Sequence, residues 1–136
     1  MGPQGTGKGF PGDLVLDAGA LIALERGDER VKGLLRGAVA LRARVFVPAS
    51  ALAQVWRGGP AAAPLAWLLE GGEIDPLEER RAKEVGLRLG ERGAADVSDA
   101  HVVCCAAEFR ATIATSDPDD IRALARPDET LTLISV

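Results

Sequence analysis

Short apolar runs alternate with amphipathic stretches along the chain from residue 13 onward. The apolar runs are rich in β-branched residues and bounded by polar, Gly or Pro residues, a pattern typical of buried strands. They predict strands within 14–16, 44–48, 71–77, 111–116 and 131–136. The stretches between them have the apolar spacing of helices, and they predict helices over 18–27, 28–41, 51–59, 64–72, 77–93, 97–110 and 118–125.

This alternation predicts the fold class. Strands separated by helices pair in parallel through right-handed crossovers. We therefore expect an α/β fold, a three-layer α/β/α sandwich with a mostly parallel central sheet, in one domain over residues 13–136. Residues 1–12 are rich in Gly and Pro and predict a flexible tail. Their GxxxxGK run lacks the Ser or Thr and the preceding strand that a phosphate-binding loop requires.

Several side chains have specific expected places. Cys104 and Cys105 are adjacent, which suits buried thiols better than an ordinary disulfide. Trp56 and Trp67 are expected to pack in the core or between helices. Ser50 is expected to cap the helix that follows it.

The charges divide the chain into two halves. Its 16 Lys and Arg against 20 Asp and Glu give a net charge of −4, with the basic excess early and the acidic excess late. The early basic residues could line an acidic site or belong to a solvated helix face, and both interpretations stay open. They are Arg26, Arg30, Lys32, Arg36, Arg42, Arg44 and Arg57. In the helix over 77–93 we expect Leu77, Val85 and Leu89 to face inward and the charges to face solvent.

No apolar run is long enough to span a bilayer, and the first ten residues lack the apolar stretch of a secretory signal. We therefore expect a cytoplasmic protein without a membrane partner.

Four aspartates are candidate metal ligands. Asp17 and Asp117 each follow a predicted strand directly, and Asp96 and Asp99 begin a predicted helix. Because ligands of open parallel sheets gather beyond the carboxyl ends of the strands, we expect these side chains to converge. Oxygen ligands without nearby Cys or His favour Mg²⁺ or Mn²⁺ over Zn²⁺.

Helix capping is the alternative explanation. Asp17 and Asp117 stand where an N-cap belongs, and Asp96 with Asp99 resembles a capping box. Capping alone leaves the crowding of the carboxylates unexplained, since adjacent negative charges repel by roughly a few kcal/mol per pair. Asp119 and Asp120 fit an ordinary acidic first turn of a helix.

The ordered set of segments LVLDAGALIAL, PASALAQVWRGG, DVSDAHVV and TSDPDDI resembles the PIN-domain family, most of all the VapC-type toxins of toxin–antitoxin pairs. The resemblance covers residues 13–136 and implies a PIN-like fold. It implies Asp17, Asp99 and Asp117 as catalytic acidic ligands of Mg²⁺ or Mn²⁺, Asp96 as a further metal ligand, and Thr115 as a supporting residue. The family glutamate on the helix after the second strand is Gln54 here, which removes one negative charge.

The resemblance implies a metal-dependent endoribonuclease that cleaves RNA phosphodiesters, pairs with a cognate antitoxin and forms a homodimer. Arg26 and Arg57 are candidate RNA contacts. The sole histidine, His101, is expected to lie near the site without a role in it, and no Ser-His-Asp set is expected. Two alternatives remain: a PIN-like module that binds RNA or protein without cleaving, and a receiver-like phosphoacceptor. The receiver is disfavoured because the middle strand ends in VPAS and no lysine follows Lys83.

Overall fold

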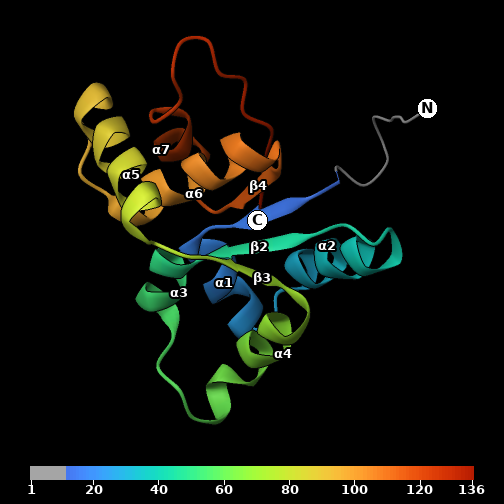
Figure 1. The fold of residues 1–136 in the computed structure, drawn as a ribbon. Coiled ribbons are helices and arrows are strands. Elements are labelled where there is room, and N and C mark those ends of the chain that lie inside the picture. The colour runs from blue at the N-terminus through green and yellow to red at the C-terminus, as the bar shows by residue number, and fades with distance from the viewer. Residues whose placement is uncertain (1–11) are drawn as a thin grey trace.

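Five parallel strands form the centre of the structure, a computed structural model that describes residues 12–136 (Figure 1). The strands are β1 (Leu14–Leu16), β2 (Val45–Pro48), β3 (Glu73–Asp75), β4 (Thr112–Thr115) and β5 (Leu133–Ser135). They lie in the order β3-β2-β1-β4-β5, and every neighbouring pair is parallel. Receiver domains have the order β2-β1-β3-β4-β5 instead, which excludes the receiver alternative. The predicted tail, except for Gly12, lies outside the described residues.

Helices cover both faces of this sheet (Figure 1). One face carries α1 (Ala18–Glu25), α2 (Glu29–Ala40), α3 (Ala49–Val55), a short 3-10 helix η1 (Pro60–Ala62) and α4 (Ala63–Gly71). The other face carries α5 (Glu79–Arg92), α6 (Val97–Phe109) and α7 (Pro118–Arg122). The expected three-layer α/β/α sandwich is thereby confirmed. Among the described residues, no helix has the length and apolar content needed to cross a bilayer.

The central strands are buried on both sides. Leu14, Val15 and Leu16 of β1 and Ile113 of β4 are fully buried. A parallel sheet between two helical layers needs such uninterrupted apolar strands because neither face meets water. Each fully buried Leu, Val or Ile side chain contributes about 1.5–3 kcal/mol relative to an exposed one. The cysteines at 104 and 105 are free and buried, as predicted.

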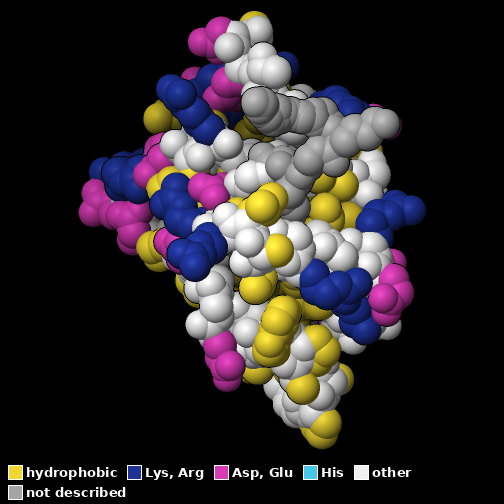
Figure 2. Space-filling view, turned by 90° about the vertical axis from the view of Figure 1, so that its right-hand side faces the viewer, with side chains coloured by type: hydrophobic (Ala, Val, Ile, Leu, Met, Phe, Trp, Pro, Cys, Tyr) yellow, Lys and Arg dark blue, Asp and Glu magenta, His cyan; other side chains and the backbone are white. Residues whose placement is uncertain are grey.

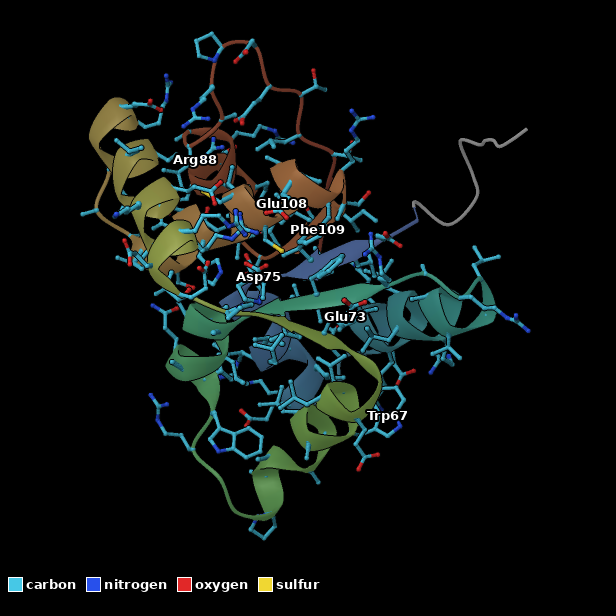
Figure 3. The ribbon with its side chains drawn as sticks, viewed as in Figure 1. Trp67, Glu73, Asp75, Arg88, Glu108 and Phe109 are labelled. Carbon is cyan, nitrogen blue, oxygen red and sulfur yellow. The ribbon has the colours of Figure 1, made fainter. Side chains whose placement is uncertain are left out.

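Helix α5 buries two arginines, which corrects the expectation that its charges face solvent. Arg81 is 1% exposed and donates from Nε to Asp75 Oδ2 at 2.9 Å and from Nη2 to Glu108 Oε1 at 2.6 Å. Arg88 is 2% exposed and bonds both carboxylate oxygens of Glu129, at 2.6 and 2.8 Å. Figure 3 shows Asp75 on β3 and Glu108 on α6, with Arg88 on the outer helix α5. The charges are buried because each guanidinium finds carboxylate partners from other elements.

Some apolar residues take other places than expected. Val85 is buried and Leu89 half-buried, as predicted, but Leu77 precedes α5 and is 39% exposed. Trp56 and Trp67 are also exposed, so their assignment to the core is wrong. Trp67 lies beside an apolar hollow of about 330 Å³ between α2 and α4, on the outer side of that helical layer (Figure 3). Figure 2 shows hydrophobic side chains gathered on the face of the molecule that it presents.

The start of α3 also differs from the prediction. Helix α3 begins at Ala49 with Pro48 as its N-cap, so Ser50 lies inside the helix and does not cap it. Proline fits this position because its fixed φ suits the extended backbone before a helix. The Ser50 hydroxyl forms a hydrogen bond of 2.7 Å with His101 Nδ1 instead. The last predicted helix, over 118–125, is shorter than expected and ends at Arg122.

Gly19 allows α1 to approach the segment after β4. A Cβ on Gly19 would lie 2.7 Å from the Cβ of Ser116. We expect Gly19→Ala to destabilise the fold by about 1–3 kcal/mol, because a methyl group has no room there. Urea unfolding followed by circular dichroism measures the change. Gly86→Ala on α5 is the matched control, since no atom lies within 4 Å of its Cβ position, and it should stabilise by up to about 1 kcal/mol. Equal stabilities of the two variants would contradict the close approach.

Candidate metal centre at the carboxyl edge of the sheet

Asp17 and Asp117 follow two neighbouring strands. β1 pairs with β4, Leu16 lies opposite Ala114, and Asp17 comes next after β1. Asp17 is 3% exposed, and its Oδ1 accepts the backbone N–H of Ala20 at 2.7 Å. Asp117 precedes α7, and its own backbone N–H donates to Thr115 Oγ1 at 2.8 Å. The parallel pairing thus brings both residues to the same edge of the sheet.

The two aspartates of α6 join them there. Asp96 is the N-cap of α6, and its Oδ1 accepts the backbone N–H of Asp99 at 2.9 Å. Asp99 lies in the first turn, where the helix dipole favours negative charge. Capping therefore occupies one oxygen of Asp17 and one of Asp96. It does not account for Asp99, and the Asp117 side chain makes no capping hydrogen bond.

The charges of the cluster act most strongly on Asp99. Burial and the nearby carboxylates raise the pKa of Asp99 to about 6. After burial, the contributing carboxylates in decreasing order are Asp96, Asp17, Asp120 and Asp117. Like charges disfavour the ionised form, so the four predicted aspartates are near enough to influence one another, and their joint role as metal ligands stays a prediction.

Opposing effects act on the pKa of Asp17. Burial raises the pKa of Asp17, and the Asp117 charge adds to this increase. The Thr115 hydroxyl and the backbone N–H groups of Ala20 and Ser116 lower it, because they donate to the ionised carboxylate. Thr115 is fully buried and thereby contacts both Asp17 and the backbone of Asp117. Its role in supporting a metal site stays a prediction.

Asp120 is a further member of the cluster. The neighbouring Asp117 carboxyl group raises the pKa of Asp120. Asp120 also lines a hollow of about 280 Å³ together with Asp96 and Asp99. The sequence explained this residue as a first-turn acid, which it also is. Its spacing of three residues from Asp117 could have indicated that both side chains share one helix face.

The donor set fits Mg²⁺ or Mn²⁺ better than a structural Zn²⁺ ion, which four protein ligands enclose. Its side-chain donors are carboxylate oxygens, which hard divalent cations prefer. Among residues 12–136, no group of three or more His, Cys, Asp or Glu side chains is close enough to form a ready ligand set. Structural Zn²⁺ sites need four such ligands, whereas Mg²⁺ is commonly bound by one or two carboxylates and several waters. Any metal ion held at this edge would therefore rest on one or two of these carboxylates and on water molecules.

The predicted RNA contacts, Arg26 and Arg57, lie at the far ends of helices that begin at this edge. Arg26 is the C-cap of α1, a helix that starts next to Asp17, so the two residues are separated by about 13 Å along the helix axis. Arg57 is exposed, and its Nη1 donates to the carbonyls of Trp56 at 2.9 Å and Ala53 at 3.5 Å. Gln54 is exposed on α3, which starts at the carboxyl end of β2.

The proposed positive rim does not include Arg44. Its backbone N–H donates to Asp13 Oδ1 at 2.8 Å, and its Nε donates to Asp13 Oδ2 at 3.2 Å. Both residues directly precede strands, at the amino ends of β1 and β2, so they lie on the opposite edge of the sheet. The guanidinium also lies over the ring of Phe46 at 5.0 Å. Arg44 therefore does not belong to the positive rim. It pairs with Asp13 of the same domain.

The structure contains a Ser-His-Asp arrangement that the sequence analysis did not expect. Ser50 Oγ lies 2.7 Å from His101 Nδ1, and His101 Nε2 lies 2.7 Å from Asp75 Oδ2. Burial lowers the pKa of His101, so the ring is neutral at pH 7, with Nε2 donating to the carboxylate. His101 is fully buried, and Asp75 is also bonded to Arg81. The set links α3, α6 and β3, with Ser50 half-buried, and the Asp75 carboxylate is held by Arg81.

Searches of the sequence against protein-family models and curated proteins find no match. The fold matches solved structures. A chain in the structure of FitAB bound to the IR36 DNA fragment has a TM-score of 0.63 and 17% identity, covering 90% of this chain and 94% of that chain. A chain of VapBC2 from Rickettsia felis, bound to a DNA fragment from their promoter, has a TM-score of 0.66 and 16% identity over 90% and 97% of the two chains. For FitAcB from Neisseria gonorrhoeae the values are 0.58 and 19%, over 88% and 95%.

The chain thus has an α/β/α fold with acidic side chains at the carboxyl edge of a parallel sheet. Chains of the FitAB, VapBC2 and FitAcB structures share this fold, which agrees with the PIN-like fold that the resemblance implied. At identities below 20%, these matches show a common fold alone. The reaction and the ligands of this chain have to be inferred from its own residues.

Proposed function

We propose that this protein is a metal-dependent endoribonuclease, the toxin of a toxin–antitoxin pair. The observation that supports this most strongly is the placement of Asp17, Asp96, Asp99 and Asp117 at one edge of the sheet, where burial and the neighbouring carboxylates raise the pKa of Asp99. Folding alone does not favour such crowding, because the carboxylates repel one another at neutral pH. A divalent cation would relieve the repulsion.

Asp17, Asp99 and Asp117 would hold Mg²⁺ or Mn²⁺, with Asp96 as a further ligand. A bound ion of this kind lowers the pKa of a coordinated water and neutralises charge on a phosphodiester. Thr115 and the first turn of α1 keep Asp17 oriented through their hydrogen bonds. These contacts fix the orientation of Asp17 before a ligand arrives.

The partners are part of the same proposal. An RNA strand is the substrate, a cognate antitoxin is the protein partner, the chain forms a homodimer, and the protein acts in the cytoplasm. The VapBC2 and FitAB structures that share the fold contain DNA, and their names denote two-component complexes. This supports an antitoxin as the protein partner. The support for an RNA substrate comes from the acidic residues at the edge of the sheet.

The test is cleavage of labelled single-stranded RNA by the purified protein with Mg²⁺ or Mn²⁺, with EDTA, and after the metal is restored. Cleavage should stop with EDTA and return with metal. Asp17→Asn should reduce the rate about 10²-fold or more, since it removes a charge that fixes the ion. Asp28→Asn is the matched control, because Asp28 caps α2 in the same way that Asp17 caps α1. Equal cleavage by both variants would sink the catalytic assignment.

The alternative is a PIN-like module that binds without cleaving, and Gln54 is the residue that favours it. The family has a glutamate at this position, so this chain has one negative charge fewer near the ion. Retained RNA binding without cleavage in any metal would support this alternative.

Gln54→Glu is expected to tighten Mn²⁺ binding about tenfold, which corresponds to roughly 1.4 kcal/mol of added attraction. Gln54 is exposed on α3, so the new carboxylate can reach solvent and costs little stability. Calorimetric titration with Mn²⁺ measures the affinity, and Gln54→Ala is the control that should leave it nearly unchanged. An affinity that stays the same in Gln54→Glu would place this side chain away from the ion.

A further inference from the structure

The hollow beside the aspartates has one basic wall. Its acidic lining consists of Asp96, Asp99 and Asp120, and Arg92 is the one cationic residue among the residues that line it. The hollow measures about 280 Å³. A hollow lined by both carboxylates and a guanidinium can attract a cation and an anion at once.

Arg92 is held in place by its own helix and by α7. It is the last residue of α5, and Gly93 follows in the left-handed conformation with φ of 62°. The Arg92 Nε donates to the carbonyl of Ala123, just after α7, at 3.3 Å. This bond uses one of the five N–H groups of the guanidinium. The side chain is thus anchored with most of its donors left over.

The remaining donors of Arg92 have no carboxylate partner close by. Within residues 12–136, no carboxylate oxygen lies within 4.0 Å of its guanidinium, whereas Arg81 and Arg88 are paired with carboxylates at 2.6 Å. Asp99 and Asp120 line the same hollow without closing on Arg92. The positive charge therefore remains available to an anion that enters the hollow.

An ordinary structural role for Arg92 also exists. A cation in the last turn of a helix interacts favourably with the helix dipole, and the bond to Ala123 joins α5 to α7. This role uses the charge and Nε. It leaves the planar fork of Nη1 and Nη2 unused, and that fork is the group that matches a phosphate in two parallel hydrogen bonds.

The basic residues expected from the sequence are less well placed. Arg26 lies at the far end of α1 from Asp17, and Arg57 directs Nη1 to two backbone carbonyls of its own segment. Arg92, in contrast, shares the hollow with Asp99. A strand that places one phosphate at the aspartates and extends through the hollow would bring a neighbouring phosphate to Arg92.

We propose that Arg92 is a positioning residue that holds a phosphate of the RNA strand next to the one that is cleaved. The proposal rests on the ribonuclease function proposed above and extends it by naming a substrate contact. Arg92 touches the strand and not the reacting phosphate, so it should affect binding more than the chemical step.

Arg92→Gln is expected to raise KM about tenfold with kcat within about twofold, because a charge-assisted bond to a phosphate contributes to binding in both ground and transition states. Arg92→Lys keeps the charge without the fork, and its KM should lie between those of the wild type and Arg92→Gln. Lys83→Gln is the matched control: it removes the same charge from α5, but Lys83 is 72% exposed and paired with Glu79. Its KM should equal that of the wild type.

The salt dependence of binding gives a second readout that needs no cleavage. Fluorescence anisotropy with a labelled single-stranded RNA, in Ca²⁺ at several NaCl concentrations, gives the slope of log K against log salt. Loss of one phosphate contact should reduce the magnitude of this slope by about 0.7 in Arg92→Gln and leave it unchanged in Lys83→Gln. Circular dichroism of each variant shows whether the fold is intact.

The outcomes separate this inference from the function on which it rests. Wild-type cleavage with the same KM and salt slope in Arg92→Gln and Lys83→Gln would overturn the role of Arg92 alone. A loss of kcat at unchanged KM would overturn it too, since that pattern indicates a role in the chemical step. An Arg92-dependent salt slope without wild-type cleavage in any metal would refute the ribonuclease proposal and keep the strand contact. If Arg92→Gln unfolds, unchanged binding and KM in the folded Arg92→Lys variant would contradict a need for the fork.

Discussion

Asp99→Asn is expected to make the protein more stable and to remove its metal-dependent cleavage. Burial and four neighbouring carboxylates raise the pKa of Asp99 to about 6, so its ionised form destabilises the folded state at pH 7. Removal of the charge should add about 1–2 kcal/mol to the free energy of unfolding once solvent screening is allowed for. This corresponds to a Tm about 4–8 °C higher for a domain of this size. Cleavage should fall about 10²-fold or more, because the same charge holds the ion.

The pH dependence of this gain follows from the direction of the shift. Asp99 binds its proton more tightly in the folded protein than the ordinary carboxyl pKa of 3.8 allows. Its destabilising effect is therefore complete above about pH 6 and fades as the pH falls from 6 towards 3.8. The difference in Tm between Asp99→Asn and the wild type should be largest at pH 7 to 8 and small at pH 4.

Asp119→Asn is the control for this prediction. Asp119 lies in the first turn of α7, close to Asp117 in the chain, but its side chain is 96% exposed. Its substitution should change neither Tm nor cleavage by much, because exposed charges are well screened. A lower Tm for Asp99→Asn, measured without added metal, would mean that Asp99 makes a stabilising contact and that the cluster is not strained.

Asp75→Asn is expected to cost about 3–5 kcal/mol of stability, the typical loss when one partner of a buried ion pair is removed. Asp75 is 6% exposed and receives bonds from Arg81 Nε at 2.9 Å, Arg81 Nη2 at 3.1 Å and His101 Nε2 at 2.7 Å. The substitution leaves the buried guanidinium of Arg81 with Glu108 as its nearest strong partner. It also replaces the carboxylate that accepts a hydrogen bond from His101 Nε2 with a neutral amide.

Urea denaturation of Asp75→Asn and of Arg80→Gln measures the difference between a buried and an exposed pair. Arg80 is the neighbour of Arg81 and pairs with Glu84 at 2.6 Å, but the two side chains are 61% and 41% exposed. Its substitution should cost less than about 1 kcal/mol. A loss below 1 kcal/mol for Asp75→Asn as well would show that the buried network does not stabilise the domain.

The strands, the helices and the position of the acidic edge could be predicted because each depends on a local pattern. LVL is continuously apolar, TIAT is β-branched except for one alanine, and an aspartate follows each of them closely. Parallel pairing then places Asp17 and Asp117 at one edge, whatever the details of packing.

The buried polar network could not be predicted in the same way. Arg81 lies four residues before Val85 and so on the inward face of α5, but its charge suggests a solvated position, and its burial depends on Asp75 and Glu108, which lie on other elements. The contact between Ser50 and His101 joins residues 51 positions apart, which no local pattern shows. The place of Arg92 beside the acidic hollow depends on the turn at Gly93 and on how α5 packs near α7.

The central claim is that the aspartates bind a divalent metal, and calorimetric titration with Mn²⁺ tests it most directly. The wild type should bind Mn²⁺ with measurable heat, Asp99→Asn should lose most of this binding, and Asp119→Asn should retain it. This order follows from the convergence of Asp17, Asp96, Asp117 and Asp120 on Asp99. Equal Mn²⁺ affinity in the three proteins, or none in the wild type, would contradict a metal centre at this edge of the sheet.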